Sequence, residues 1–176
     1  MSEVKLIITG PPGAGKTTAI AAISETPPVR TDTRTTDDLS SVKEETTVAM
    51  DFGELTLDDG QKIFLYGTPG QKRFEFMWKI LVEGGLGLII LVDCSRPEPV
   101  NDLKIYLENF SDFIEKTGVV VGITRTDGVN APEISEFYEC LESTGRIFPM
   151  FEVDIRERED VALLIDALVS ALEFSQ

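Results

Sequence analysis

Short apolar runs recur along the chain, and each is followed by a stretch in which apolar residues return at helical spacing. Runs of this length, bounded by turn residues, are typical of strands buried on both faces of a parallel sheet. The strands expected from them are Val4 to Thr9, Leu86 to Asp93, Val119 to Thr124 and Ile147 to Ile155.

The intervening stretches carry apolar residues three and four positions apart, which predicts helices with one buried face. The stretch from Pro132 to about Ser143 is expected to turn four apolar residues inward, namely Ile134, Phe137, Tyr138 and Leu141. The predicted helices are Lys16 to Ser24, Lys72 to Glu83, Val100 to Lys116, Pro132 to about Ser143, and Glu159 to Glu173.

Two segments depart from this alternation. Thr46 to Leu57 alternates apolar and polar residues, and Asp58-Asp59-Gly60 then gives a hairpin turn before Gln61 to Gly67, so these two strands are expected to be antiparallel. The polar segment Glu25 to Glu45 predicts a long, mobile, functional loop, with a disordered insertion without function as the alternative. The expected fold is α/β, a mostly parallel six-stranded sheet with one antiparallel strand and helices on both faces.

The first turn of the expected sheet carries the clearest chemistry. The sequence GPPGAGKT, Gly10 to Thr17, fits the pattern G-x-x-x-x-G-K-[ST] between a strand and a helix, where backbone N–H groups converge on phosphate oxygens. Lys16 would reach the β- and γ-phosphates, and the Thr17 hydroxyl would hold Mg²⁺. A glycine-proline turn with an unrelated lysine is the alternative. The predicted phosphate-binding residues are Gly10, Gly13, Ala14, Gly15, Lys16, Thr17 and Thr18.

Composition narrows the class of protein. The 176 residues suit one domain, 1–176, and the formal net charge of −15 argues against nucleic acid or an anionic membrane as a general partner. No signal-peptide pattern or lipidation signal is present, so a cytoplasmic protein without its own membrane anchor is expected. The absence of histidine excludes a His-based zinc site or catalytic triad, and Cys94 and Cys140 are expected to be reduced and buried.

The segment TTVAMDFGELTLDDGQKIFLYGTPGQKRF, Thr46 to Phe74, resembles the small GTPases of the Ras superfamily. Its TPGQ is similar to the bacterial and archaeal Mgl-type branch and to predicted bacterial GTPases likened to the signal-recognition-particle receptor β subunit. The resemblance covers nearly the whole chain and implies the three-layer G domain of P-loop NTPases. It also implies that Thr47 binds Mg²⁺ in the triphosphate state, that the Gly70 amide meets the γ-phosphate, and that Gln71 orients the attacking water. The implied catalytic residues are Gln71, Lys16 and Thr47.

The resemblance also implies a site that recognises guanine. Thr124-Arg125-Thr126-Asp127 matches the box N/T-K-x-D, whose aspartate accepts hydrogen bonds from guanine N1–H and N2–H₂. Arg125 stands in place of the usual lysine and is expected to cover the purine by stacking. Asp154 and Ile155 occupy the place of the last box, where a backbone amide near Ile155 is expected to contact the base.

Gly67 stands where most of these relatives carry an aspartate that holds Mg²⁺ through water. Asp51, on the neighbouring strand, is the candidate substitute, and an ordinary exposed strand carboxylate is the alternative interpretation. Phe74, Met77 and Trp78 form an apolar stripe, for which packing on the sheet is favoured over a partner surface.

The leading hypothesis is therefore a guanine-nucleotide switch that binds GTP and GDP with Mg²⁺ and hydrolyses GTP slowly. An ATP-using P-loop nucleoside or small-molecule kinase is one alternative, and a non-catalytic nucleotide-binding scaffold is another. The resemblance implies a regulatory partner, either a roadblock-type protein or another activator or exchange factor.

Overall fold

The computed structural model describes residues 3–36, 45–70 and 75–174, with backbone alone for 30–36, 45–49 and 75. Its elements follow one another as strands and helices in alternation, apart from one hairpin region near the start and one pair of consecutive helices. They are β1 (Val4–Thr9), α1 (Lys16–Ile23), β2 (Val29–Thr36), β3 (Glu45–Thr56), β4 (Lys62–Gly67), α2 (Glu75–Leu81), β5 (Gly87–Asp93), α3 (Pro99–Asn109), α4 (Ser111–Ile114), β6 (Gly118–Thr124), α5 (Ile134–Glu142), β7 (Met150–Glu152) and α6 (Arg158–Glu173).

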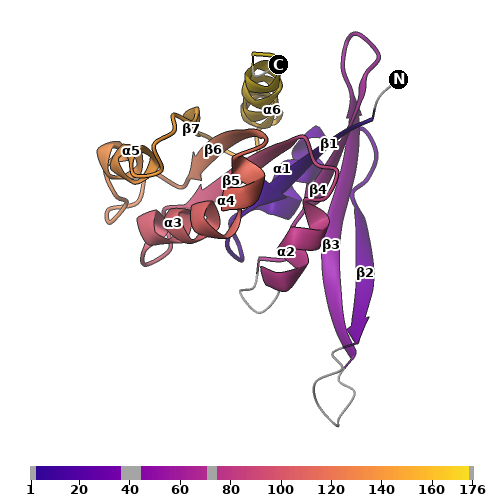
Figure 1. Ribbon diagram of the computed structural model, residues 1–176, viewed down its shortest axis with the longest axis horizontal. Helices are drawn as coiled ribbons and strands as arrows, with labels where there is room; N and C mark the ends of the chain where they lie inside the picture. The colour runs from indigo at the N-terminus through magenta and orange to yellow at the C-terminus, as the bar shows by residue number, and fades with distance from the viewer. Residues whose placement is uncertain (1–2, 37–44, 71–74, 175–176) are drawn as a thin grey trace.

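One sheet runs through the fold in the order β2-β3-β4-β1-β5-β6-β7 (Figure 1). β1 pairs in parallel with β4 and β5, and β6 pairs in parallel with β5 and β7. β3 is antiparallel to both of its neighbours, β2 and β4. The expected α/β architecture with one antiparallel strand is therefore confirmed, whereas the described sheet has seven strands and not six.

The additional strand, β2, lies inside the segment that the sequence predicted to be a loop. It pairs with β3 from Val29 opposite Phe52 to Thr36 opposite Glu45. Threonine and valine favour the extended backbone, and an edge strand does not need the apolar alternation of a buried one. The loop prediction was therefore wrong for Val29–Thr36 and for Glu45, where β3 begins. Residues 25–28 belong to no helix or strand, and residues 37–44 lie outside the described ranges. Figure 1 shows the β2–β3 ribbon extending beyond the rest of the sheet.

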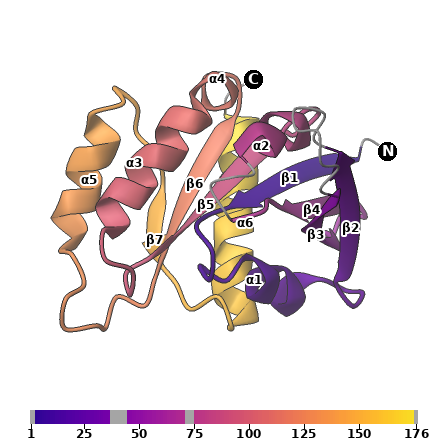
Figure 2. The ribbon, with the colours of Figure 1, turned by 90° about the horizontal axis from the view of Figure 1, so that it is seen from below.

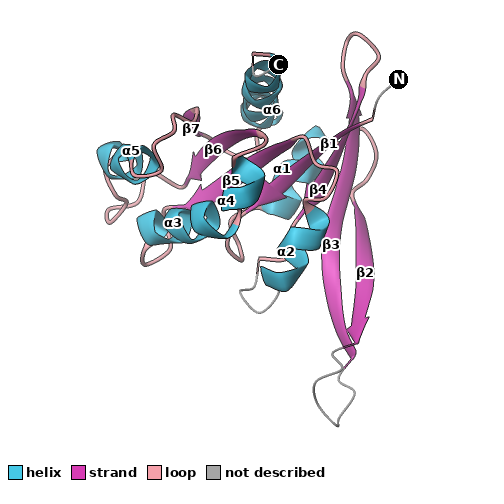
Figure 3. Cartoon of the chain, viewed as in Figure 1, coloured by secondary structure: helices cyan, strands magenta, loops and turns pink. Residues whose placement is uncertain are grey.

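Helices cover both faces of the sheet, with α1 and α6 on one face and α2 and α3 on the other (Figures 2 and 3). Successive residues of a central strand point to opposite faces, which produces two apolar cores. In β1, Leu6 and Ile8 join the core under α1 and α6, whereas Ile7 joins the core that contains Trp78 of α2.

The predicted helix at Val100 to Lys116 is two helices, α3 and α4. The chain leaves helical geometry at Phe110, which has φ −99° and ψ 12° and buries its ring in the core. The predicted continuous helix was therefore wrong at Phe110, and it ran two residues past the end of α4 at Ile114.

The last strand and the helix before it are shorter than expected. β7 begins only at Met150, because Pro149 has no N–H to donate to a sheet ladder. Ile147, predicted to lie in this strand, is 98% exposed. In α5, Phe137 and Leu141 are buried as expected, but Ile134 and Tyr138 are exposed.

The apolar stripe of α2 behaves largely as the packing interpretation expected. Met77 and Trp78 are buried, while Phe74 lies outside the described ranges. Within the described ranges, no helix is both long and apolar enough to cross a membrane.

Candidate functional site

The candidate site lies where the parallel strands end. The glycine-rich loop follows β1, Thr68 follows β4, Cys94 follows β5 and Arg125 follows β6. In open α/β sheets, ligands bind outside the carboxyl ends of the strands, near the point where the chain passes to either side of a central strand. β1 is that strand here, because β4 and β5 flank it.

The glycines of the loop are required by shape and by backbone conformation. Gly13 and Gly15 have φ of 77° and 100°, in the left-handed region that other residues rarely adopt. A Cβ on Gly15 would lie 2.1 Å from Cδ1 of Ile155, and one on Gly10 would lie 2.6 Å from the carbonyl oxygen of Leu91. Within the loop, the Ala14 N–H donates to the Pro11 carbonyl at 3.1 Å. The result is a tight turn with few side chains, which leads into α1 and its exposed Thr17 and Thr18.

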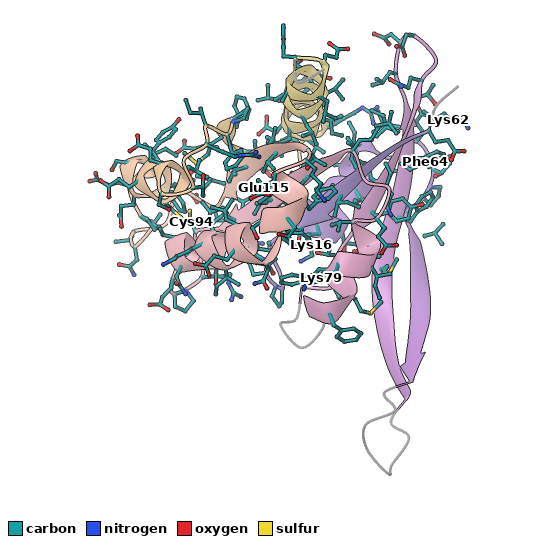
Figure 4. All side chains as sticks on the ribbon, in the orientation of Figure 1. Lys16, Lys62, Phe64, Lys79, Cys94 and Glu115 are labelled. Atoms are coloured by element: carbon teal, nitrogen blue, oxygen red, sulfur yellow. The ribbon has the colours of Figure 1, made fainter. Side chains whose placement is uncertain are left out.

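Lys16 is a buried ammonium group above this loop. Its Nζ donates to the carbonyl oxygens of Gly10, at 2.6 Å, and Pro11, at 3.0 Å. Burial lowers the pKa of Lys16 to about 8, against the opposing effect of the Asp51 carboxylate, and the positive charge of Arg96 lowers it slightly further. Figure 4 shows Lys16 within the fold, whereas Lys62 and Lys79 lie on exposed positions. A partly dehydrated cation at this place favours an anionic ligand.

Asp51 lies beside the position where the expected aspartate is missing. It stands opposite Gly67 in the β3–β4 register, and a Cβ on Gly67 would be 3.3 Å from the Asp51 Cβ. The Thr17 hydroxyl donates a hydrogen bond to the Asp51 carboxylate. Two hard oxygen groups therefore meet here, as Mg²⁺ prefers. Asp51 is half-buried and engaged, so it is not the ordinary exposed carboxylate of the alternative interpretation.

In the described ranges there is no cluster of three or more His, Cys, Asp or Glu residues arranged to hold a metal ion. Such an all-protein cluster suits calcium or zinc better than Mg²⁺, which commonly uses one or two protein oxygens together with phosphates.

Gly70 lies against the phosphate loop. A Cβ at this position would lie 2.7 Å from Lys16 Nζ and 2.8 Å from the Pro12 nitrogen. The Thr9 and Thr68 hydroxyls share a buried hydrogen bond of 2.7 Å, which joins the ends of β1 and β4 just before the two loops. TPG and GPPGAGKT therefore meet as expected.

Two expected catalytic residues receive no side-chain placement. Gln71 lies outside the described ranges. Thr47 lies on β3 with its backbone opposite Arg34, and its side chain is outside the description.

A pocket of about 550 Å³ opens between the ends of β6 and β7. Its walls are residues 124–127 and 152–156, the two segments expected to recognise the base. Ile155 also touches the space beside Gly15, so this pocket adjoins the phosphate loop. A larger hollow of about 1140 Å³ lies at the opposite ends of β5 and β6, where Leu86 and Gly118 form part of its wall. No residue of the phosphate loop borders this hollow.

Asp154 lies in the pocket wall but has partners within the chain. Arg156 hydrogen-bonds to its carboxylate and lowers the pKa of Asp154 to about 2. The Asp154 N–H donates to the Asp160 carboxylate at 2.7 Å. The carboxylate and the N–H of Asp154 are therefore engaged before any ligand is considered.

Arg125 connects the pocket to the phosphate loop. It has a left-handed backbone, φ 55°, and its Nη1 donates to the Gly13 carbonyl at 3.1 Å and to the Asp93 carboxylate. Asp93 is buried and also accepts from the backbone N–H and hydroxyl of Ser95, at 2.9 and 2.6 Å. These polar contacts engage Nη1 at the edge of the guanidinium, and the expected stacking of Arg125 on a purine stays a prediction. Sequence reasoning missed Asp93, whose signal is a carboxylate at the end of the otherwise apolar run of β5.

The glycine-rich loop between β1 and α1, with its buried lysine, defines a P-loop nucleotide-binding protein. Residues 8–173 match the family described as conserved hypothetical ATP binding protein. The Ras-related protein Rab-1C of Dictyostelium discoideum is 30% identical over 158 residues, which are 88% of this chain and 73% of that protein. The chain therefore belongs to this ATP-binding family and to the Ras-related P-loop proteins.

Two further relatives cover different shares of the chain. The uncharacterized protein MJ1339 of Methanocaldococcus jannaschii is 34% identical over 124 residues, 66% of this chain and 72% of that protein. The Ras-related protein RabC of Dictyostelium discoideum is 24% identical over 175 residues, 96% of this chain and 83% of that protein. The resemblance to Ras-type GTPases is thus confirmed at the level of the family.

Proposed function

We propose that the protein is a guanine-nucleotide switch that binds GTP and GDP with Mg²⁺ and hydrolyses GTP slowly. The observation that carries this proposal is the pocket beside the phosphate loop, because Asp127 is part of its wall. A carboxylate there can accept from both N1–H and N2–H₂ of guanine, whereas adenine presents an acceptor at N1. Leaving such a group unpaired costs about 1 to 3 kcal/mol, which corresponds to roughly tenfold to a hundredfold discrimination.

In this proposal the loop amides and Lys16 bind the phosphates. A bound phosphate anion offsets the burial of the Lys16 ammonium and raises its pKa from about 8. The Gly70 N–H is assigned to the γ-phosphate, which supports a role in distinguishing the triphosphate from the diphosphate.

The Thr17 hydroxyl and the Asp51 carboxylate fit a magnesium site, and Thr47 would add a ligand in the triphosphate state. Their meeting at the Gly67 position supports this assignment. When bound, Mg²⁺ supplies neutralisation of the phosphate charge. Gln71 is assigned to orient the attacking water, while Lys16 and the loop amides stabilise the charge on the transferring phosphoryl group.

We also propose a branch of the family, a domain organisation and a class of regulatory partner for this protein. The TPGQ sequence supports the Mgl-type branch and, with it, a regulatory partner of roadblock type or another activator or exchange factor. The length of 176 residues without a composition shift supports a single G domain, 1–176. A pulldown with a roadblock-type protein in the GDP and triphosphate states tests the partner. Binding in neither state would contradict it.

A matched variant tests recognition of guanine. Asp127→Asn replaces one acceptor by an amide donor, which suits the C2 carbonyl of xanthine and not the C2 amine of guanine. We expect the variant to lose GDP affinity by about tenfold or more and to gain affinity for xanthosine diphosphate. Asp166→Asn, on α6, serves as a control that changes neither affinity. Unchanged GDP binding by Asp127→Asn would contradict the assignment of Asp127.

A further inference from the structure

The chain has one tryptophan, Trp78, and its indole is tied to the TPG loop. Trp78 lies on α2 and is only 3% exposed. Its Nε1–H donates to the carbonyl oxygen of Pro69 at 2.9 Å, a buried hydrogen bond across nine residues. The expectation that Trp78 serves packing alone leaves this donor unexplained.

The hydrogen bond also fixes the direction of the next amide. The carbonyl of Pro69 and the N–H of Gly70 belong to one peptide unit, which is planar and trans. In such a unit the C=O and N–H point in opposite directions, so a donor that holds the carbonyl also sets the N–H. Pro69 is itself buried, so without the indole its carbonyl would lack this partner.

The indole cannot readily follow a movement of the loop, because the other core residues hold it. Its ring stacks on Tyr106 at 4.9 Å between centroids and on Phe110 at 5.3 Å, with interplanar angles of 24° and 13°. Tyr106 belongs to α3, and Phe110 is the first residue after the end of α3. Buried aromatic stacks of this kind resist displacement. The position of the Pro69 peptide therefore depends on packing against α3 as well as on its own loop.

The peptide unit held in this way is next to the phosphate-binding cation. Gly70 lies so close to Lys16 that an added Cβ would be 2.7 Å from Nζ. A donor at Gly70 therefore acts in the same small volume as the ammonium group that would meet the terminal phosphates.

We infer that Trp78 is a positioning residue that aims the Gly70 N–H at the γ-phosphate and so favours the triphosphate over the diphosphate. The inference rests on the proposed function, since it takes the γ-phosphate as the ligand of Gly70. It goes further by assigning the orientation of that amide to the indole N–H of Trp78 on α2.

The test compares nucleotide affinities of Trp78→Phe with those of the unchanged protein. Phenylalanine keeps an aromatic ring in the stack and removes the Nε1–H donor. We expect affinity for a non-hydrolysable GTP analogue to fall by about tenfold while GDP affinity stays within about twofold. Equal losses for both nucleotides, or no loss for the analogue, would overturn the inference.

Phe110→Leu is the matched control, because it shortens the same stack and leaves the indole donor in place. It should lower the melting temperature without changing the ratio of the two affinities. A ratio shifted as strongly as in Trp78→Phe would show that packing alone is responsible and would overturn the inference.

A second measurement needs no substitution. The single indole N–H gives one resonance in a protein labelled with ¹⁵N-tryptophan. That resonance should exchange slowly with solvent and should shift when the GTP analogue replaces GDP. A fast-exchanging resonance, or one at the same position in both complexes, would contradict the inference. If the unchanged protein binds neither GDP nor the analogue, it is the proposed function that fails.

Discussion

The candidate site has two ends that differ in composition: the phosphate end, formed by the glycine-rich loop and Lys16, and the base end, formed by the pocket of residues 124–127 and 152–156. The phosphate end consists of backbone, glycine and one buried ammonium, packed so closely that added carbon atoms at Gly15 and Gly70 would collide with neighbours. The base end is an open pocket lined by charged side chains, two of which, Asp154 and Arg156, pair with each other. Under the proposed function, phosphate binding would therefore be fixed by the fold, whereas the choice of base would depend on a few exchangeable side chains.

Breaking the phosphate end should have the largest effect. Gly15→Ala places a Cβ 2.1 Å from the Ile155 side chain and forces alanine into φ 100°. We expect it to lower the free energy of unfolding by about 2 to 4 kcal/mol, from left-handed strain and overpacking together. Urea unfolding measures this change.

Gly13→Ala is the matched control, because its φ of 77° is also left-handed but no atom lies within 4 Å of the added Cβ. It should cost only the strain, about 1 to 2 kcal/mol. In the Gly15→Ala background, Ile155→Ala should recover part of the loss. Equal costs at the two glycines would contradict the close contact with Ile155.

The link between the two ends should give the next largest effect. Asp93→Asn removes the buried charge that Arg125 contacts while Arg125 also holds the Gly13 carbonyl. Because Arg125 is half exposed, we expect a moderate effect, with GDP dissociating about fivefold to twentyfold faster. Stopped-flow release of a fluorescent GDP measures the rate. Glu108→Gln, in an exposed pair with Lys104, should leave it unchanged. A rate unaffected by Asp93→Asn would remove the link.

The buried lysine predicts a pH dependence of the nucleotide-free protein. Burial lowers the pKa of Lys16 from its usual value of 10.5 to about 8. Between these values the unfolded chain holds more protons than the folded one, so the free energy of unfolding should rise with pH there, by at most about 1 kcal/mol per pH unit. Urea unfolding from pH 7.5 to 10 tests this, with Lys16→Met as the variant that should lack the rise. A slope shared by both proteins would contradict it.

The smallest effect is expected at Asp154, in the wall of the base pocket. Asp154→Asn alters a carboxylate that is already paired with Arg156 and open to solvent. We expect GDP affinity to change by less than about threefold, because exposed ion pairs contribute little. A calorimetric titration that found a loss above tenfold would instead assign Asp154 to direct contact with the nucleotide.

The sequence could predict the phosphate end better than the rest. Ile7, Ile8 and the runs in β5 and β6 are buried on both sides, and such strands leave continuous apolar runs that also locate the loops at their ends. The conformations of Gly13 and Gly15 follow from the loop pattern itself.

The remaining features depend on contacts between distant residues. β2 is a polar strand at the edge of the sheet, and β3 is its neighbour there. Because β2 lacks the apolar pattern of a buried strand, its sequence resembles that of a loop. The break between α3 and α4 falls at Phe110, whose ring stacks on Trp78. The partnership of Asp93 with Arg125 joins residues 32 positions apart. No local pattern encodes these three contacts.

The central claim is that the open pocket recognises guanine, although the family description names ATP. The most direct test is a titration of nucleotide-stripped protein with fluorescent GDP and ADP in Mg²⁺. The account predicts GDP binding at least about tenfold tighter than ADP binding, with the preference lost in Asp127→Ala. Equal binding of both nucleotides, unchanged by that substitution, would contradict the account and favour an ATP-using P-loop enzyme.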